Sequence, residues 1–586
     1  MKRRTKIICT LGPATDNPTV LSELMLSGMN AARLNFSHGS YDEHLKRINM
    51  VKKLRDEMGL PIALLLDTKG PEIRTGCFKD GKITLKRGQK FTLTPKETEG
   101  TEDSVSISYG DLYRDIEKGM RILIDDGLIE MLVSEINGED IICEVLNDGV
   151  VSDHKSINVP DANLTMDYMS PKDITDIEFG IQQGVDFIAA SFVRSAFDVL
   201  EIKRILEQHK ATDIQVIAKI ENRQGVEDID NILRASDGIM IARGDMGVEI
   251  PFEELPSIQK ELIEKCYISG KRVITATQML ESMTHNPRPT RAETSDVANA
   301  VYDGTSAVML SGETAVGSYP VRALKTMAQI CTKAEDDINY IKRFEARHFD
   351  TVIGVPNAIS HSACTTAHDL GAAAIITVSK SGFTARVISG FRPNCPIIAG
   401  CMNDKVFRQL ALSWGVTPIH TKMKKTTDAL FDHVVEEALA QTNLITKGDI
   451  AVITGGAPLG ISGTTNILKV QLVGDVLLSG MSASNKSVCG TVCVAKNTAE
   501  ALKNFKDGDI LVIPETNNDL VGILRKASAI ITEKSGLTSH AAVVGMTLDI
   551  PVICGAEGAT EILKNGTTIT IDGSRGQVYG GVAKIV

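Results

Sequence analysis

Residues 214–225 read IQVIAKIENRQG, a strand-like apolar run that carries two charged residues, Lys219 and Glu221. In a β-strand successive side chains alternate between the two faces, so these two charges point the same way. Because burying an unpaired charge is costly, the run predicts either a structural ion pair at a strand end or two polar groups of a functional site. The run alone leaves both open.

Seven more apolar runs of this kind occur along the chain, most of them separated by segments with helical spacing such as 22–30 and 256–271. The eight runs are TKIICT (5–10), AARLNF (31–36), PIALLLD (61–67), VDFIAAS (185–191), QVIAKIE (215–221), GIMIAR (238–243), RVITAT (272–277) and SAVMLS (306–311). Eight strand–helix units with strands that are apolar on both faces predict a closed (β/α)8 TIM barrel. An open doubly wound sheet is the alternative, which the count of eight disfavours.

Between the third and fourth runs the pattern changes to an alternation with period two, in KITLKRGQKFTLTP (82–95), MRILIDDGLIEMLV (120–133) and IICEVLNDGVV (141–151). This pattern predicts a small all-β domain inserted in the barrel. An insertion after the C-terminal end of a barrel strand sits over the active face, so we expect a lid.

The rest of the chain predicts two further α/β units. Their expected strands are AAAIITV (372–378), PIIAG (396–400), VTPIH (416–420), DIAVITG (449–455), DILVIP (509–514), AIITEK (529–534), DIPVICG (549–555) and TTITIDG (567–573). We therefore expect a barrel formed by 1–69 and 170–345, a β-barrel lid at 70–169, an α/β domain at 346–473 and an extra small α/β domain at 474–586.

Composition narrows the class of protein. A formal net charge of −11 and 4% aromatic residues provide neither the basic surface nor the stacking platforms that nucleic-acid binding uses, so we expect no nucleic-acid partner. The eleven cysteines include no CxxC pair, which argues against disulfides and zinc. No run of about eighteen apolar residues predicts a membrane span, and the first apolar run is too short for a secretion signal. We expect a cytoplasmic protein.

Side chains at the C-terminal ends of barrel strands converge on one mouth. Here that mouth would collect Arg33, Asn35, Ser37, His38, Asp67, Thr68, Lys69, Arg74, Lys219, Glu221, Arg243, Gly244, Asp245, Thr277, Ser311 and Glu313. Cations beside carboxylates suit a phosphorylated anion bound through Mg²⁺, which prefers one or two carboxylates such as Glu221 and Asp245. Lys219 would neutralise a transferring phosphoryl group. For any single pair, a solvated salt bridge is the alternative.

Long motifs at these positions resemble the pyruvate kinase family over residues 1–473. They are IQVIAKIENRQGV (214–226), KIICTLGPAT (6–15), ARLNFSHG (32–39), LLLDTKGPEIRTG (64–76), IMIARGDMGVEIP (239–251), ITATQMLESM (274–283) and VMLSGETAVGSYP (308–320). The resemblance implies phosphoryl transfer from phosphoenolpyruvate to ADP, giving pyruvate and ATP, with Mg²⁺ (or Mn²⁺) and K⁺ as cofactors. It also implies a homotetramer and a phosphorylated allosteric effector.

The resemblance also implies roles for individual residues. Arg33 and Lys219 would hold the phosphoryl group, Glu221 and Asp245 would bind Mg²⁺, and Gly244, Asp245 and Thr277 would lie at the substrate. Asn35, Ser37, Asp67 and Thr68 match the family's K⁺ site, and Glu72 accompanies K⁺ dependence. Asn35, His38, Arg74 and Lys155 would contact the nucleotide, with Lys155 on the lid. Thr277, Ser311 and Glu313 would relay a proton through water. Because Lys219 and Glu221 then serve phosphate and metal, we expect their direct pairing to be secondary.

The run IITVSKSGFTAR (375–386) predicts a strand, a loop and a helix start, which is either an ordinary capped helix or an anion site. The resemblance favours an effector site formed by Ser379, Lys380, Ser381, Gly382, Thr384 and Arg386, with TGGAPLGISGTTN (454–466) as a second wall. AMP, a sugar monophosphate and fructose bisphosphate all remain open as the effector.

The segment EKSGLTSHAAVVGM (533–546) resembles the phosphohistidine domain of phosphoenolpyruvate-utilising enzymes, with His540 at the phosphorylated position. Two departures from that motif, at Ser535-Gly536 and Gly545-Met546, favour a structural or interaction role over phosphorylation. Two other functions stay open as alternatives: a dikinase-like phosphotransferase acting through His540, and a non-catalytic metabolite sensor.

Overall fold

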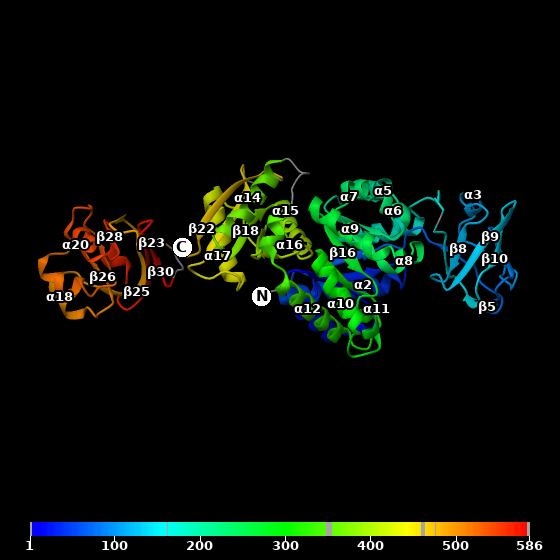
Figure 1. Cartoon of the computed structure of the whole chain (residues 1–586), viewed down its shortest axis with the longest axis horizontal. Coiled ribbons are helices and arrows are strands. Elements are labelled where there is room, and N and C mark those ends of the chain that lie inside the picture. The colour runs from blue at the N-terminus through cyan, green and yellow to red at the C-terminus, as the bar shows by residue number, and fades with distance from the viewer. Residues whose placement is uncertain (1–2, 161, 347–353, 459–462, 475, 583–586) are drawn as a thin grey trace. The chain divides into compact units, whose positions relative to one another are not determined.

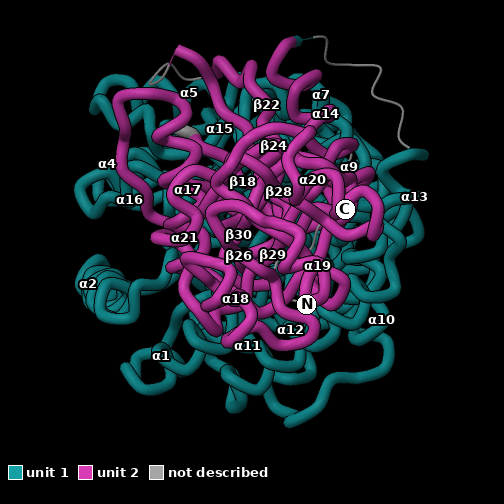
Figure 2. The backbone as a smooth tube through the Cα atoms, turned by 90° about the vertical axis from the view of Figure 1, so that its left-hand side faces the viewer, with its two compact units in different colours: residues 1–354, 380–392, 401–418 teal, residues 355–379, 393–400, 419–586 magenta. Residues whose placement is uncertain are grey.

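The computed structural model describes residues 3–160, 162–346, 354–458, 463–474 and 476–582. The chain forms two compact units, shown in teal and magenta in Figure 2. The first unit comprises residues 1–354, 380–392 and 401–418, and the second comprises 355–379, 393–400 and 419–586. No helix of the described residues is long and apolar enough to cross a membrane.

Eight parallel strands of the first unit close into a barrel, one for each predicted run, so the predicted barrel is confirmed. In spatial order the strands are β1 (Lys6–Thr10), β2 (Ala31–Asn35), β3 (Ala63–Asp67), β13 (Phe187–Ala190), β14 (Gln215–Ile220), β15 (Gly238–Ala242), β16 (Arg272–Ala276) and β17 (Ala307–Leu310). Alternate strand residues such as Ile8, Leu65 and Ile217 fill one buried cluster. The strand residues that alternate with these belong to a second buried cluster, which also contains helix residues. Both faces of the strands are therefore buried, which explains why the strands are apolar on both faces.

Helices follow the barrel strands and surround them (Figure 1). The longer helices are α1 (Pro18–Leu26), α2 (Tyr41–Met58), α4 (Pro171–Gln182), α5 (Ala196–Gln208), α9 (Leu255–Ser269), α10 (Arg291–Asp303) and α12 (Pro320–Asp337). The short ones are η1 (Pro13–Thr15), α6 (Arg223–Glu227), α7 (Ile229–Ala235), α8 (Arg243–Glu249), η2 (Glu281–Thr284), α11 (Gly312–Ala315) and α13 (Tyr340–Glu345). The start of α2 is a capping box of Ser40 and Glu43, and Gly59 ends it with a φ of 63°.

Residues between β3 and α4 form the predicted all-β insertion, with a hydrophobic core of its own. Its elements are β4 (Ile73–Arg74), β5 (Lys82–Leu85), β6 (Lys90–Thr94), β7 (Ser104–Ser106), α3 (Leu112–Asp115), β8 (Arg121–Ile124), β9 (Ile129–Asn137), β10 (Asp140–Val145), β11 (Gly149–Ser152) and β12 (Ser156–Asn158). Seven strands form one sheet in the order β4-β12-β8-β9-β10-β6-β7, and β11 pairs with β5. We call this insertion the lid domain.

A five-stranded sheet with the order β20-β19-β18-β21-β22 forms the predicted second α/β domain. Its elements are α14 (Val355–Asp369), β18 (Ala374–Ser379), α15 (Phe383–Phe391), β19 (Ile397–Cys401), α16 (Asp404–Leu410), β20 (Val416–His420), α17 (Thr427–Gln441), β21 (Ile450–Gly456) and β22 (Thr465–Leu472). The edge strand β22 was not predicted, because it is only partly buried and has no continuous apolar run.

The C-terminal sheet has eight strands in the order β23-β30-β29-β25-β26-β27-β28-β24. Its elements are β23 (Val476–Ser479), β24 (Met481–Ser482), β25 (Ser487–Val494), α18 (Thr498–Asn504), β26 (Ile510–Ile513), η3 (Asn518–Leu520), α19 (Val521–Leu524), β27 (Ala529–Thr532), α20 (His540–Leu548), β28 (Val552–Cys554), α21 (Ala559–Ile562), β29 (Thr568–Asp572) and β30 (Gln577–Gly580). The sequence predicted β26, β27, β28 and β29, but not β23, β24, β25 and β30, each of which has an antiparallel partner.

A buried carboxylate fixes the start of the barrel. Glu335 on α12 accepts hydrogen bonds from the backbone N–H groups of Arg4 and Thr5, at 2.8 and 2.5 Å. Replacing Glu335 with Ala leaves both buried donors without this acceptor, at about 1–3 kcal/mol each. We expect the denaturant midpoint of the barrel to fall clearly in E335A. The exposed Glu23, paired with Lys325 at 2.7 Å, is the matched control, and E23A is expected to change stability by less than about 0.5 kcal/mol. Equal midpoints for both variants would contradict this role of Glu335.

Candidate active site

Lys219 lies on the same face of β14 as Ile217, which is buried inside the barrel, so its ammonium reaches the C-terminal mouth. Nζ lies 2.7 Å from Ser191 Oγ, 2.9 Å from Glu221 Oε1 and 3.2 Å from Asp67 Oδ1. Burial by itself would lower the pKa of Lys219, but the carboxylates of Asp67 and Glu221 outweigh it and raise this pKa. The ammonium therefore stays charged near neutral pH.

The expectation that Lys219 and Glu221 pair only secondarily is wrong, since they are in direct contact at 2.9 Å. Glu221 directly follows the last residue of β14, and side chains two residues apart in extended chain are close enough for their ends to meet. A buried ammonium also needs acceptors, and attraction between opposite charges is strong in a low dielectric. The two readings of the opening stretch are thus compatible, because the ion pair lies within the mouth.

Glu221 is fully buried and only partly satisfied. Its Oε2 accepts a hydrogen bond from the backbone N–H of Phe192 at 2.6 Å. Its Oε1 is close to the Lys219 ammonium but has no partner with good hydrogen-bond geometry. Burial and the negative charge of Asp245 raise the pKa of Glu221, whereas the Lys219 ammonium acts in the opposite direction. Two carboxylates that repel each other make a place for a cation.

Arg33 and Asp67 form a second buried ion pair at the mouth. Arg33 Nε lies 2.6 Å from Asp67 Oδ2, and Arg33 Nη1 donates to Thr10 Oγ1 at 3.0 Å. Burial alone would raise the pKa of Asp67, but Arg33 and Lys219 outweigh it and lower this pKa. One carboxylate thus holds both cations that were predicted to bind a phosphoryl group.

The predicted K⁺ ligands are neighbours of this pair. Asn35 faces Asp67 across the β2–β3 register, and Asn35 Oδ1 accepts from the Ser37 N–H at 3.2 Å. Thr68 Oγ1 accepts from the Ser191 N–H at 3.1 Å. The structure therefore brings Asn35, Ser37, Asp67 and Thr68 to the adjoining ends of β2 and β3.

Sequence reasoning missed Ser191, which lies at the centre of the cluster. Its hydroxyl accepts from Lys219 Nζ, and it contacts Asp67 Oδ1 at 3.1 Å and the Thr68 carbonyl at 2.7 Å. The only signal in the sequence was that a polar residue ends the otherwise apolar run VDFIAAS (185–191). Ser191 therefore positions the ammonium between β3 and β14.

Thr277 and Gly244 meet at the neighbouring strand ends. The Gly244 N–H donates to Thr277 Oγ1 at 2.7 Å, and Thr277 and Gln278 have positive φ values of 64° and 52°. Consecutive non-glycine residues in the left-handed region store strain that usually marks a functional site. Arg243, in contrast, is directed to Asp296 at 2.7 Å and to the Thr277 carbonyl, so its role is to hold the loop.

Glu313 and Ser311 occupy the end of β17. Glu313 accepts from the N–H groups of Ser311 at 2.7 Å and Leu280 at 3.0 Å, and burial raises its pKa. The Ser311 hydroxyl is buried and has no hydrogen-bond partner among the described residues. It is therefore available to a further polar group.

A pocket of about 340 Å³ between the lid domain and the strand ends collects most of the predicted nucleotide contacts. His38, Arg74 and Lys155 line it together with Asp245, whereas Asn35 is not among the described residues that do. Arg74 is held by both oxygens of Glu72, at 2.9 and 3.1 Å. Lys155 Nζ lies 2.8 Å from Asp125. The pocket therefore has cations whose positions are fixed by carboxylates.

The predicted effector residues lie at the start of α15. Gly382 is its N-cap with a φ of 74°, and this position makes no side-chain capping hydrogen bond. Arg386 Nη1 donates to the Ser381 carbonyl at 2.8 Å, Lys380 is exposed, and Thr384 is buried. Ser379 ends β18, and its side chain lies outside the described part, as do residues 459–462 of the second predicted wall.

His540 is the first residue of α20, and both its ring nitrogens have partners. Nδ1 lies 2.9 Å from Thr516 Oγ1, and Nε2 lies 3.1 Å from Asn518 Oδ1. Because the amide oxygen can only accept, Nε2 carries the proton in this arrangement. The ring is therefore fixed in one tautomer by its neighbours.

Opposite charges buried at a barrel mouth, beside a pocket with fixed cations, are suited to phosphoryl transfer. The fold and this site define a barrel-type phosphotransferase. Comparisons with known proteins agree: the pyruvate kinase barrel domain matches residues 2–324, the pyruvate kinase alpha/beta domain matches 357–471, and the mobile domain of PEP-utilising enzymes matches 505–576.

The similarity extends over the whole chain. It is 50% identical over 586 residues to a pyruvate kinase from Bacillus licheniformis and 50% identical over 588 residues to one from Geobacillus stearothermophilus, with 100% of both chains covered each time. A crystal structure of a pyruvate kinase from Cryptosporidium parvum matches with a TM-score of 0.77 and 39% identity, covering 80% of this chain and 96% of that one. The chain belongs to the pyruvate kinase family.

The central position of Ser191 generates a prediction. Replacing Ser191 with Ala removes one acceptor of the Lys219 ammonium, which can then shift toward the carboxylates. We expect kcat to fall about tenfold to a hundredfold, with little change in the KM for nucleotide, because misplacing a reacting group affects the transition state more than binding. Steady-state kinetics of S191A tests this, and the exposed serine of α9, in S257A, is the control. A kcat for S191A equal to that of S257A would contradict the positioning role.

Proposed function

We propose that this enzyme transfers the phosphoryl group of phosphoenolpyruvate to ADP, giving pyruvate and ATP. The observation that carries the proposal is the Lys219 ammonium, which is buried at the mouth and kept charged by two carboxylates. A fixed positive charge at this place can stabilise a phosphoryl group in transfer without any reorganisation. The curated relatives support the proposal, because they are pyruvate kinases along the full length of the chain.

The mouth residues divide the work in this proposal. Arg33 and Lys219 bind the phosphoryl group from two sides, and Asp67 keeps both cations apart and in place. Gly244 and Thr277, which are hydrogen-bonded to each other, border the substrate carboxylate. His38, Arg74 and Lys155 bind the nucleotide in the pocket that they line, and we assign Asn35 to the monovalent-cation group rather than to this pocket.

A divalent metal fits the carboxylates of this mouth. Among the described residues, no cluster of three or more His, Cys, Asp or Glu side chains could hold a metal on its own. Glu221 nevertheless has a buried oxygen without a hydrogen-bond partner, and Asp245 is close enough to affect its pKa. Mg²⁺ (or Mn²⁺) prefers this donor set, with one or two carboxylates and substrate oxygens. When bound, the metal would supply Lewis-acid stabilisation of the negative charge that develops on the substrate.

Protonation of the methylene carbon needs a group other than Lys219. The Lys219 ammonium keeps its proton, because its two carboxylate neighbours raise its pKa. We assign this step to water held by Thr277, Ser311 and Glu313. The buried, unpartnered Ser311 hydroxyl and the raised pKa of Glu313 support this assignment.

The metal assignment has a direct test. We expect the wild-type enzyme to form pyruvate from phosphoenolpyruvate with ADP, Mg²⁺ and K⁺ in a coupled assay. Glu221→Gln should lower kcat about a hundredfold or more and weaken Mn²⁺ binding, because a charged ligand is lost. The control is Glu254→Gln, which removes a half-buried charged partner of Arg223 outside the mouth. Normal turnover and Mn²⁺ binding in E221Q would remove the assignment, and no pyruvate from the wild type would overturn the proposed reaction.

We propose a K⁺ site formed by Asn35, Ser37, Asp67 and Thr68, the oxygen-rich group at the ends of β2 and β3. Glu72 supports K⁺ dependence, since it neutralises Arg74 and leaves that side of the mouth without an extra cation.

Replacing K⁺ with Na⁺ at constant ionic strength should therefore lower kcat several-fold. Glu72→Lys should make the rate nearly independent of the monovalent cation, because a fixed ammonium replaces the mobile charge. Activity in Na⁺ equal to that in K⁺ for the wild type would contradict the site.

We propose regulation by a phosphorylated metabolite at the loop of residues 379–386, where the N-terminus of α15 has no side-chain cap and the cations Lys380 and Arg386 are suited to a phosphate. Activation assays with AMP, sugar monophosphates and fructose bisphosphate would identify the effector. If neither the wild-type enzyme nor K380A is activated by any of these compounds, the effector site is contradicted.

The remaining assignments are proposals from the family. We place the domain boundaries at 69/70, 169/170, 345/346 and 473/474. We also infer a cytoplasmic homotetramer without nucleic-acid or membrane partners. Light scattering, which measures the mass of the assembly, can test the homotetramer. For His540 we propose a structural role, because Thr516 and Asn518 occupy both ring nitrogens. Phosphohistidine at this position after incubation with phosphoenolpyruvate would contradict it.

A further inference from the structure

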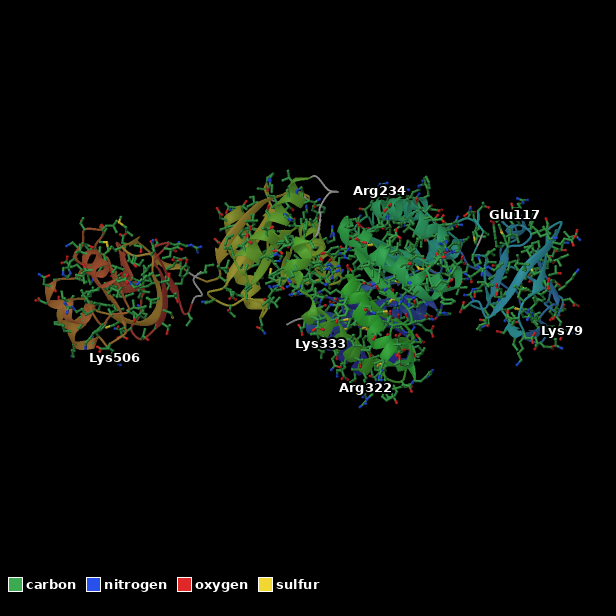
Figure 3. The ribbon with its side chains drawn as sticks, viewed as in Figure 1. Lys79, Glu117, Arg234, Arg322, Lys333 and Lys506 are labelled. Carbon is green, nitrogen blue, oxygen red and sulfur yellow. The ribbon has the colours of Figure 1, made fainter. Side chains whose placement is uncertain are left out.

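Cys77 and His154 on the lid domain form a pair that the proposed reaction does not use. Cys77 Sγ lies 3.2 Å from His154 Nε2, and both residues are exposed. Lys79, two residues after Cys77, is labelled on the same domain in Figure 3. Neither member of the pair lines the nucleotide pocket.

This accessibility distinguishes Cys77 from most cysteines of the chain. The buried ones are Cys9, Cys143, Cys266, Cys331, Cys364, Cys401, Cys493 and Cys554. Cys395 is half-buried, and only Cys489 on β25 is exposed as Cys77 is. Among the described hydrogen bonds, no imidazole is paired with Cys489. Cys77 is therefore set apart by two properties together, access from solvent and a base at hydrogen-bond distance.

The reactive form of a cysteine is the thiolate, and a neighbouring imidazole promotes it by accepting the thiol proton. Exposed cysteines with thiolate character are the ones that peroxides oxidise. The geometry of Cys77 and His154 is that of a nucleophile and its base.

Hydrogen bonds connect this pair to the nucleotide pocket. The His154 carbonyl accepts from Arg74 Nη1 at 2.8 Å, and the His154 N–H donates to the Gly76 carbonyl at 3.3 Å. The next residue, Lys155, is bonded through its N–H to Thr75 Oγ1 at 2.9 Å. Arg74 and Lys155 both line the pocket. A change at the Cys77 sulfur that displaces His154 would therefore reach two nucleotide-side cations.

We propose that Cys77 and His154 form a site of reversible oxidation by hydroperoxides, and that the oxidised form binds nucleotide more weakly. His154 takes the thiol proton, and the thiolate sulfur attacks one peroxide oxygen. The S–O bond forms as the O–O bond breaks, so sulfur is oxidised by two electrons and the peroxide is reduced. The leaving hydroxide takes the proton from His154, giving water from hydrogen peroxide and a sulfenic acid at Cys77. An added thiol restores the reduced form through a mixed disulfide.

The chemical part of the proposal is tested without an activity assay. The intact enzyme is treated with hydrogen peroxide and dimedone, and labelling at each cysteine is followed by peptide mass spectrometry. We expect Cys77 to react about tenfold or more faster than Cys489, and His154→Asn to remove most of that advantage, since general-base help is worth about a hundredfold or more. Asn suits this position because His154 has a φ of 55°, which Asn tolerates. Equal labelling of Cys77 in wild type and H154N, or of Cys77 and Cys489 in the wild type, overturns the proposal.

The coupling part rests on the proposed function, because its readout is the KM for ADP. Peroxide treatment should raise this KM about threefold or more, in proportion to Cys77 labelling, and leave the KM for phosphoenolpyruvate unchanged. Added thiol should reverse the shift. The Cys77→Ser enzyme should have the kinetic constants of the untreated wild type, and peroxide should not change them. A KM for ADP that does not change in fully labelled enzyme overturns the coupling. If untreated enzyme forms no pyruvate at all, the proposed function fails, while the labelling result still decides the chemistry.

Discussion

The structure of the mouth depends on one constraint: a charge taken out of water needs a partner. Asp67 is completely buried at the end of β3, and it satisfies Arg33 through one oxygen and Lys219 through the other. Without this carboxylate the two cations would repel each other. With it, both remain charged at a fixed separation, which is what binding of a phosphoryl group requires.

The barrel supplies that arrangement from strands far apart in the sequence. The strands β3, β13 and β14 are neighbours in the closed sheet, so Asp67, Ser191 and Lys219 meet although 152 positions separate the first from the last. Side chains on both faces of these strands belong to buried hydrophobic clusters. The lid domain has a hydrophobic core of its own and adds the cations Arg74 and Lys155 to the neighbouring pocket.

Much of the fold could be predicted because its signals are local. Each barrel strand is a short apolar run, and each ends in polar residues that have no place in a core. Ser191 was not predictable in this way, since a serine at a strand end is common and its role comes from residues on two other strands. The strands β23 and β25 were missed because they are partly exposed and pair with strands that are distant in the sequence, as β25 does with β29.

The direct contact of Lys219 with Glu221 also could not be read from the sequence. Spacing shows that two side chains share a face, but whether they touch depends on the competing acceptors, here Asp67 and Ser191. The contact gives the ammonium a second carboxylate neighbour, which raises the pKa of Lys219 and favours its charged form. Lys219 is thereby suited to hold a phosphoryl group and unsuited to donate a proton.

That division of roles is the central claim, and the Lys219→Met enzyme tests it most directly. Two rates are measured with the same metal: phosphoryl transfer from phosphoenolpyruvate to ADP, and exchange of the methyl hydrogens of pyruvate in deuterated water. The account predicts that transfer falls about a thousandfold, while exchange stays within about tenfold of the wild type because Lys219 takes no part in it. Equal loss of both rates, or transfer that survives the substitution, would contradict it.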